Sequence, residues 1–372
     1  DGITLASQSE RMRDAMQRHY EQVIEPAHVA LHGHPPVSGA AIEELMQDQP
    51  AYQIYGSVRY NAQRMVYLTA IDPIEREHER LVQFARAVAS ERPAGGTLRL
   101  NPELVVPRYV TALDVHLIPG GFHSEYVADD VAQGALIAWG GQASGGANAE
   151  RADDGGGVAR SIATWLERAH PKFKPAAMLD LGTQSGKNLV PYLDVFPQVE
   201  AHGVDVSAPA LRYGHVKAEC AGKRVHFSQQ NAEELDFPDA HFQLIVSSFF
   251  FHELPLKATH RILAECHRVL APGGMMVDME LPPHELCTAW QNFYWDWDAK
   301  HNNEPFYVDF RSQELPTLMS EAGFDKDATF MRVVPNVATF DMQQYEGFLA
   351  GEVAAPLHGR GGWFVFGARK DG

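Results

Sequence analysis

The chain has 372 residues, which points to about two domains at roughly 150 residues per domain. Its apolar fraction of 45% and charged fraction of 21% are typical of a folded globular protein and exclude a disordered or fibrous chain. The net charge of −17 disfavours nucleic acid as a partner, because an acidic surface repels phosphate backbones. No apolar run approaches the roughly 20 residues that a membrane span needs, so we expect no membrane span.

The three cysteines predict a cytoplasmic protein. Cys220, Cys266 and Cys287 are odd in number and far apart, which favours reduced thiols over a disulfide framework.

The first part of the chain is predicted to be mostly helical. Apolar residues recur at helical spacing in 9–23, 41–48, 58–71 and 73–89. Residues 97–117 are rich in β-branched and aromatic side chains, and both strands and loops fit them. The glycine-rich stretch 139–158 predicts a linker or loop. We therefore place a boundary near residue 150, with an N-terminal domain at 1–150 and a second domain at 151–372.

Strands and helices alternate after this boundary. Short apolar runs of strand length occur at 177–181, 201–206, 225–228, 242–247 and 275–280, and helix-like stretches lie at 187–193, 208–221 and 257–270. This alternation predicts an α/β fold with a mostly parallel sheet and helices on both faces.

The turn after the first of these strands carries two glycines, Gly182 and Gly186, which let the backbone approach a ligand closely. Dinucleotide enzymes also place glycines at such a turn, but with the spacing G-x-G-x-x-G. Here Asp180 precedes the turn, where a carboxylate would repel a pyrophosphate and attract an ammonium group.

This segment resembles the first motif of the class I S-adenosylmethionine-dependent methyltransferases, with Asp180, Gly182 and Gly186 matching and Gln184 replacing the usual middle glycine. The closest subgroup is the type 11 group of small-molecule methyltransferases. The resemblance implies S-adenosylmethionine as cofactor and S-adenosylhomocysteine as product. Asp205 and Val206 end the second strand, where a carboxylate can accept hydrogen bonds from both ribose hydroxyls. The family's adenine-binding segment corresponds to Asn231, Ala232 and Glu233, and Ser247 ends the next cofactor-bordering strand.

The resemblance also implies a Rossmann-like seven-stranded sheet. Residues 328–334 and 363–368 fit the antiparallel hairpin that closes it, and residues from about 283 to 312 fit an acceptor-side insertion.

For catalysis we consider His252, since an unperturbed imidazole pKa near 6.5 suits a base at neutral pH. The alternative is that His252 only braces the loop in which it lies. Within the insertion, Trp290, Tyr294 and Trp297 follow helical spacing, so they form either an aromatic wall for a small-molecule acceptor or a core stripe. Tyr60, in the N-terminal region, is a further acceptor candidate, because helices before the methyltransferase domain cover the acceptor or form a homodimer in relatives.

We predict no metal site, and ascribe His32, His34, His116 and His123 to surface or packing roles. The resulting prediction is transfer of a methyl group to a small molecule. Two alternatives stay open, a non-catalytic S-adenosylmethionine-binding protein and a nicotinamide-dependent oxidoreductase.

Overall fold

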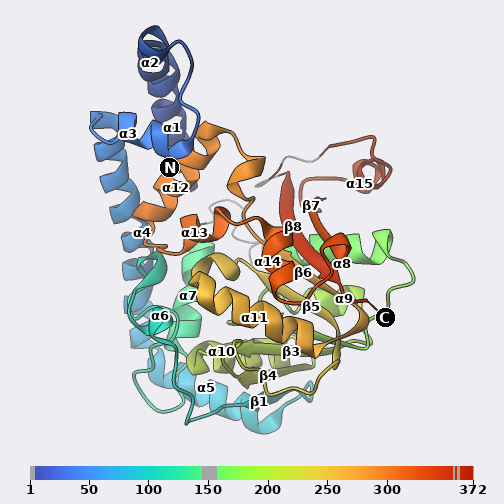
Figure 1. The fold of residues 1–372 in the computed structure, drawn as a ribbon. Helices are drawn as coiled ribbons and strands as arrows, with labels where there is room; N and C mark the ends of the chain where they lie inside the picture. The colour runs from blue at the N-terminus through green and yellow to red at the C-terminus, as the bar shows by residue number, and fades with distance from the viewer. Residues whose placement is uncertain (1–4, 145–156, 355–356, 358–360, 372) are drawn as a thin grey trace.

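The computed structural model describes residues 5–144, 157–354, 357 and 361–371. An eight-stranded sheet runs through it in the order β1-β4-β3-β2-β5-β6-β8-β7 (Figure 1). Neighbours from β1 to β6 in this order are parallel, whereas β8 is antiparallel to both β6 and β7. The strands are β1 (Thr97–Arg99), β2 (Ala177–Leu181), β3 (Glu200–Asp205), β4 (Val225–Gln229), β5 (Phe242–Ser248), β6 (Leu270–Met279), β7 (Thr329–Pro335) and β8 (Gly362–Arg369).

The strand order reverses direction at β2, because β3 and β4 follow on one side and β5 and β6 on the other. In an open parallel sheet this reversal leaves a crevice at the carboxyl ends of the strands, which is where ligands bind.

Each face of the sheet has its own hydrophobic core. Met178 of β2 and Leu244 of β5 point into the first core, and their neighbours Leu179 and Ile245 point into the second. This alternation is the period of two expected of a strand that is buried on both faces. The first core is covered by α8 (Val158–Ala169), α9 (Tyr192–Val195) and α10 (Ala208–Cys220), and the second by α11 (Leu256–Val269) and α14 (Leu315–Glu321).

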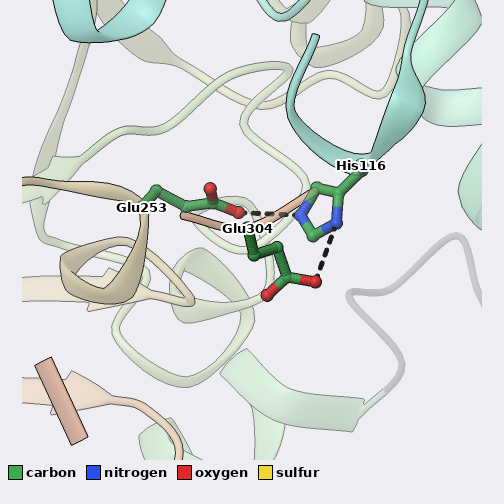
Figure 2. A group of neighbouring side chains, drawn as sticks. All are labelled: His116, Glu253 and Glu304. Atoms are coloured by element: carbon green, nitrogen blue, oxygen red, sulfur yellow. Dashed lines mark ion pairs between the residues drawn. The ribbon is translucent and has the colours of Figure 1, made fainter. Parts of the chain in front are cut away.

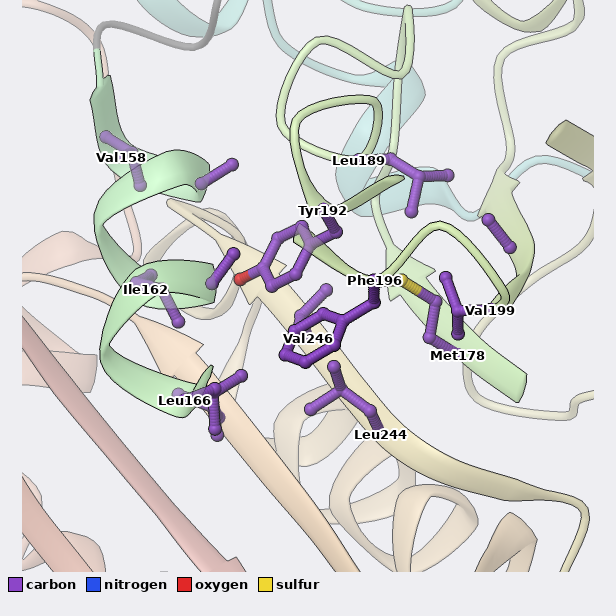
Figure 3. Packing of buried hydrophobic residues seen from close by; sticks show 14 of the residues in the cluster. Val158, Ile162, Leu166, Met178, Leu189, Tyr192, Phe196, Val199, Leu244 and Val246 are labelled. Carbon is purple, nitrogen blue, oxygen red and sulfur yellow. The ribbon is translucent and has the colours of Figure 1, made fainter. Parts of the chain in front are cut away.

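Figure 3 shows how α8 closes the first core. Val158, Ile162 and Leu166 lie one turn apart on a single face of α8 and pack toward Tyr192, Phe196 and Leu244. Each fully buried leucine of this kind contributes about 2 kcal/mol relative to an exposed one.

The predicted parallel sheet with helices on both faces is confirmed, with one correction to the strand count. Residues 97–99, for which strands and loops were both open, form β1 and pair with β4. The sheet therefore has eight strands where the sequence predicted seven. The helix expected over 187–193 is also shorter, because turns occupy most of that stretch before α9.

The N-terminal region is mostly helical, as predicted, and its first helices project away from the sheet (Figure 1). Helix α4 continues past Pro73, which lies in its last turn and lacks the backbone N–H that would otherwise bond to the carbonyl of Thr69. The elements are α1 (Leu5–His19), the π-helix η1 (Tyr20–Ile24), α2 (Glu25–His32), α3 (Gly39–Met46), α4 (Pro50–Arg76), α5 (His78–Glu91), α6 (Arg108–Thr111), η2 (Val115–Leu117) and α7 (Ala132–Ser144).

Helix α7 contains the first residues of the predicted linker, from Trp139 to Ser144, so this part is helical. The middle of that linker, residues 145–156, lies outside the described residues. The division into domains at 1–150 and 151–372 stays a prediction.

The region expected as an insertion contains α12 (Ala289–His301), which packs against α3 and α4 of the N-terminal region, and α13 (Tyr307–Arg311), which packs against α12. None of the helices in the described ranges is long and apolar enough to cross a bilayer. Shorter elements complete the chain: η4 (Phe251–Glu253), η5 (His284–Leu286), η6 (Lys326–Ala328) and α15 (Met342–Leu349).

Candidate functional site

A cavity of about 790 Å³ lies at the carboxyl ends of β2, β3 and β5. We call the part lined by Asp180, residues 182–185, residues 187–188 and residues 205–206 the strand-end half. The part lined by N-terminal residues, η4, α12 and α13 is called the helical half. Its lining includes Arg59, Tyr67, Tyr109, His116, Phe122, His252, Glu253, Tyr294, Trp295, Asp298, Glu304 and Tyr307.

The turn after β2 is held in a left-handed conformation. Gly182 has φ of 60°, and a side chain there would place its Cβ 2.4 Å from the ring of Phe250. Gly186 has φ of 68° and is packed against Phe227, so it supports the turn without lining the cavity. Gln184, which departs from the glycine pattern, also has a positive φ, of 47°, and lines the cavity. The backbone path that a glycine would take is therefore kept by glutamine, at the cost of some strain.

Asp180 and Asp205 end neighbouring strands and both line the strand-end half. The Asp205 carboxylate accepts hydrogen bonds from the backbone N–H of Gln184 at 2.9 Å and of Ser207 at 2.8 Å. Each oxygen is thereby fixed and keeps a lone pair for a ligand.

Burial raises the pKa of Asp180 to about 7, and the nearby Asp205 carboxylate adds to this rise. A cationic group arriving beside Asp180 would favour its ionised form. The strand-end half therefore fits a ligand that carries an ammonium group and neighbouring hydroxyls.

The structure places the remaining strand-end candidates at different depths. Val206 lines the cavity, whereas Ala232 belongs to the second core and Ser247 donates to Asp278 inside the sheet. The Asn231 Oδ1 accepts the backbone N–H of Glu233, and neither residue lines the cavity. Instead, Glu233 holds the hydroxyl of Tyr109, which does line it.

His252 lies at the junction of the two halves and is 3% exposed. Its Nδ1 is 2.7 Å from Glu280 Oε2, and its Nε2 is 3.5 Å from Glu253 Oε1. Burial alone would lower the pKa of His252, but the two carboxylates raise it well above the ordinary value. The assumption of an unperturbed pKa near 6.5 is therefore wrong, while the role of His252 in catalysis stays a prediction.

His116, Glu253 and Glu304 meet in the helical half (Figure 2). The His116 Nε2 is 2.7 Å from Glu253 Oε1, and its Nδ1 is 3.2 Å from Glu304 Oε1. These charges raise the pKa of His116 well above its usual value, even though burial opposes the change. The sequence predicts a surface or packing role for His116 and no role for Glu304. No local motif signals this cluster, because its members come from three separate segments.

The aromatic residues of the predicted insertion divide between the cavity and a core. Tyr294 lines the helical half, and so do Trp295 and Tyr307, which the sequence analysis did not select as acceptor candidates. Trp297 is 1% exposed and packs in a core with residues of α1, α3 and α4, and Trp290 stacks on Tyr20 at 5.0 Å. Of the stripe predicted as an aromatic wall, Trp290 and Trp297 are thus placed as packing residues. Tyr60 is 41% exposed and does not line the cavity.

An ion pair connects the N-terminal region to the insertion across the helical half. Arg59 of α4 contacts the Asp298 carboxylate of α12 through two bonds, of 2.6 and 3.2 Å. Arg59 precedes the predicted Tyr60 by one residue, and the rotation of about 100° between successive residues of α4 decides which side chain reaches the cavity.

Comparison with known proteins places residues 178–274 in the family described as "Methyltransferase domain". A demethylmenaquinone methyltransferase of Thermus thermophilus is 35% identical over 33% of this chain and 53% of that protein. A second one, of Geobacillus kaustophilus, is 27% identical over 46% of this chain and 83% of its own length. A solved structure of Haemonchus contortus phosphoethanolamine N-methyltransferase 2 with S-adenosyl-L-methionine covers 57% of this chain and 52% of its own at 18% identity, with a TM-score of 0.40.

The matched residues 178–274 include Asp180, Asp205 and His252 but stop before α12. They also exclude Arg59 and His116. The family match thus covers the strand-end half, and most of the helical half lies outside it.

Proposed function

We propose that this chain is a class I S-adenosylmethionine-dependent methyltransferase, which its similarity to methyltransferases over residues 178–274 supports, and that it transfers a methyl group to a small molecule held in the helical half of the cavity. When bound, the cofactor supplies a sulfonium methyl group that is open to in-line attack. The protein's contribution is to hold the acceptor in line with that methyl group, and positioning of this kind can account for much of the acceleration.

The observation that carries the proposal is the pair Asp180 and Asp205 at the end of adjacent strands, facing one cavity. In this proposal Asp180 pairs with the cofactor's ammonium group, and Asp205 accepts hydrogen bonds from its ribose hydroxyls. The left-handed turn at Gly182 lets the Phe250 ring pack closely against the backbone, since a Cβ there would lie 2.4 Å from that ring, and Gly182 itself lines the cavity. A dinucleotide would instead bring a pyrophosphate next to the Asp180 carboxylate.

The small-molecule acceptor is supported by the shape and lining of the helical half. Aromatic side chains and buried charged groups surround it, which suits a compact acceptor better than a polymer. The names of the matched relatives indicate a quinone acceptor for those proteins. We do not extend that acceptor to this chain, because the matched family region omits most of the helical half.

We further propose a cytoplasmic location, on the basis of three widely spaced cysteines that show no pairing among the described residues. A homodimer through the N-terminal region is a second proposal. It is supported by exposed apolar side chains along α4, including Ile54, Val58, Met65 and Leu68.

The test is calorimetric titration of the full chain with S-adenosylhomocysteine. Asp205→Asn should weaken binding at least roughly tenfold, the loss expected for a charge-assisted hydrogen bond. The matched control is Asp236→Asn, since that side chain is 76% exposed and outside the cavity.

Absence of binding to the unmodified chain would remove the proposal, and binding of a reduced nicotinamide dinucleotide in its place would support the oxidoreductase alternative. Binding without methyl transfer to any acceptor in a broad panel would support the non-catalytic alternative.

A further inference from the structure

The helical half contains a group of metal-ligating side chains that methyl transfer from a sulfonium does not by itself require. His116, Glu253 and Glu304 each offer one ligand atom, and these atoms all lie within 4.8 Å of one another (Figure 2). Ligand atoms around an ion with bonds of about 2.0–2.3 Å are separated by roughly 3–4.5 Å. The spacing therefore matches a shared coordination sphere as well as it matches a chain of ion pairs.

His252 borders the same group. Its Nε2 lies 3.5 Å from Glu253 Oε1 and 3.9 Å from Glu304 Oε2. On the opposite side of the ring, Nδ1 is 2.7 Å from Glu280, whose side chain is fully buried. A buried carboxylate behind an imidazole is the arrangement that orients metal-ligating histidines, because it fixes the tautomer and directs the other nitrogen toward the ion.

Glu280 is itself held in place, which strengthens the comparison of His252 with carboxylate-oriented, metal-ligating histidines. Its Oε1 accepts the backbone N–H of Phe251 at 2.7 Å. The imidazole of His252 is therefore positioned by a rigid partner and not by a mobile surface side chain.

The ion pairs alone leave part of the group unsatisfied. Glu253 Oε2 is buried and has no hydrogen-bond partner among the described residues, and the same holds for Asn302 Oδ1 beside His116. A buried carboxylate oxygen without a partner is costly unless something outside the protein binds it. In addition, three carboxylates (Glu253, Glu280 and Glu304) face two imidazoles, so that two imidazolium charges would still leave one carboxylate uncompensated. The neighbouring Arg59 is paired with Asp298.

We propose that His116, Glu253 and Glu304 bind a divalent transition-metal ion beside His252, and that this ion coordinates an oxygen atom of the acceptor. The mixed set of one imidazole and two carboxylates suits Mn²⁺, Fe²⁺ or Zn²⁺ better than Mg²⁺ or Ca²⁺, which prefer oxygen ligands alone. Three protein donors leave the other positions of a six-coordinate ion for the acceptor and water. Metal coordination lowers the pKa of a bound hydroxyl, whose proton can then leave to water. The acceptor part of this proposal rests on the proposed function, whereas the metal site stands on the side chains alone.

The test measures metal binding without cofactor or acceptor. The full chain is treated with a chelator, dialysed and titrated with Mn²⁺, and free Mn²⁺ is followed by electron paramagnetic resonance at room temperature. We expect saturable binding of one Mn²⁺ per chain, with displacement by Zn²⁺. Absence of saturable binding by the unmodified chain would overturn the proposal, whatever any variant does.

Two variants locate the ion. Glu253→Gln and Glu304→Gln should each weaken Mn²⁺ binding at least roughly tenfold, since loss of even a supporting partner costs 10–100-fold. The control is His215→Gln, because His215 is also buried beside a carboxylate, Glu219, and lies outside the cavity. Circular dichroism and thermal unfolding establish that each variant is folded.

Unchanged Mn²⁺ affinity in the folded glutamate variants would also overturn the proposal and leave a structural ion-pair network. Failure of the methyltransferase proposal is distinguishable, because it would appear as absence of S-adenosylhomocysteine binding while Mn²⁺ binding persists.

Discussion

The strand-end half and the helical half of the cavity differ in how far apart in the sequence their neighbouring residues lie. Asp180 and Asp205 stand at the ends of adjacent strands, and the turn that follows Asp180 donates the Gln184 backbone N–H to the Asp205 carboxylate. In the helical half, Arg59 and Asp298 are 239 residues apart, and His116 meets Asn302 from a distance of 186 residues. Local backbone geometry makes the first half, and tertiary packing makes the second. This difference leads to distinct expectations for substitutions in the two halves.

The largest effect is expected where the helical half depends on packing. Trp297 is 1% exposed and fills the core between α12 and the N-terminal helices. Trp297→Ala should lower the free energy of unfolding by about 3–5 kcal/mol, as large-to-small core substitutions do. Urea unfolding followed by circular dichroism measures this loss.

The matched control is Tyr294→Leu, one turn away on the same helix but facing the cavity. It should lose less than half as much stability and should affect mainly acceptor turnover. Equal losses for the two variants would show that Tyr294 is a core residue and that the cavity wall is misassigned.

The next effect concerns pH and the strand-end half. Burial raises the pKa of Asp180 to about 7, so the free protein holds a proton there below that pH. An ammonium ligand requires the ionised form, and its binding must therefore release the proton. The affinity for S-adenosylmethionine should rise by up to about tenfold per pH unit, or about 1.4 kcal/mol, as pH increases toward 7 and should level off above it.

Calorimetry between pH 5.5 and 8.5 in buffers of different ionisation enthalpy measures both the affinity and the released proton. Asp278 and Tyr192 also carry titratable groups whose charges couple to Asp180. Asp180→Asn is therefore the necessary control, and it should bind weakly with a flat profile. A flat profile in the unmodified chain would contradict the assignment of Asp180 to the ammonium group.

The raised pKa of Asp180 also affects the free energy of unfolding, and in the opposite direction to its effect on cofactor affinity. Because the folded pKa of Asp180 lies above the unfolded value, the free energy of unfolding falls as pH rises from about 4 to 7, and the cost persists above pH 7. The Asp180→Asn chain without cofactor should consequently melt at a higher temperature than the unmodified chain at pH 8.

The smallest effect is expected at Gln184. Its φ of 47° is the conformation that glycine adopts without strain. Gln184→Gly should change the free energy of unfolding by less than about 1 kcal/mol and preserve cofactor binding, because relief of strain and added flexibility of the unfolded chain nearly cancel. Gln184→Val should be worse than Gln184→Gly by about 1–2 kcal/mol, since a β-branched residue is poorly suited to a left-handed backbone. Equal stability of the two variants in urea unfolding would show that the turn does not impose this conformation.

The two halves also differ in how far the sequence predicts them. The strands around Asp180 and Asp205 are predicted from apolar runs and from the glycine turn, because both signals are local. Gln184 interrupts the glycine pattern of the turn. The turn is still present because its backbone conformation also depends on the flanking residues Gly182 and Gly186. His252 could be selected from its place after a strand, whereas its raised pKa depends on Glu280, a partner 28 residues away.

The helical half was not predictable in the same way. Trp290, Tyr294 and Trp297 share one helical stripe, and the pattern cannot say which of them faces a cavity and which faces a neighbouring helix. No local sequence pattern indicates a role for Glu304, because its place in the cluster depends on His116, which tertiary packing brings into contact with it.

Strand β1 shows that the N-terminal region also completes one edge of the sheet, in addition to lining the cavity. Its three residues lie along β4, and Glu219 of α10 anchors the preceding loop by accepting the backbone N–H groups of Ala94 and Gly96. Without this segment, β4 would become the outer strand of a sheet with unpaired backbone groups along one side, a ready template for association with another chain. A fragment that starts after residue 150 would therefore lose the strand that protects the edge of β4 from aggregation, together with the N-terminal helices that line the cavity. Low solubility of such a fragment would say nothing about its capacity for catalysis.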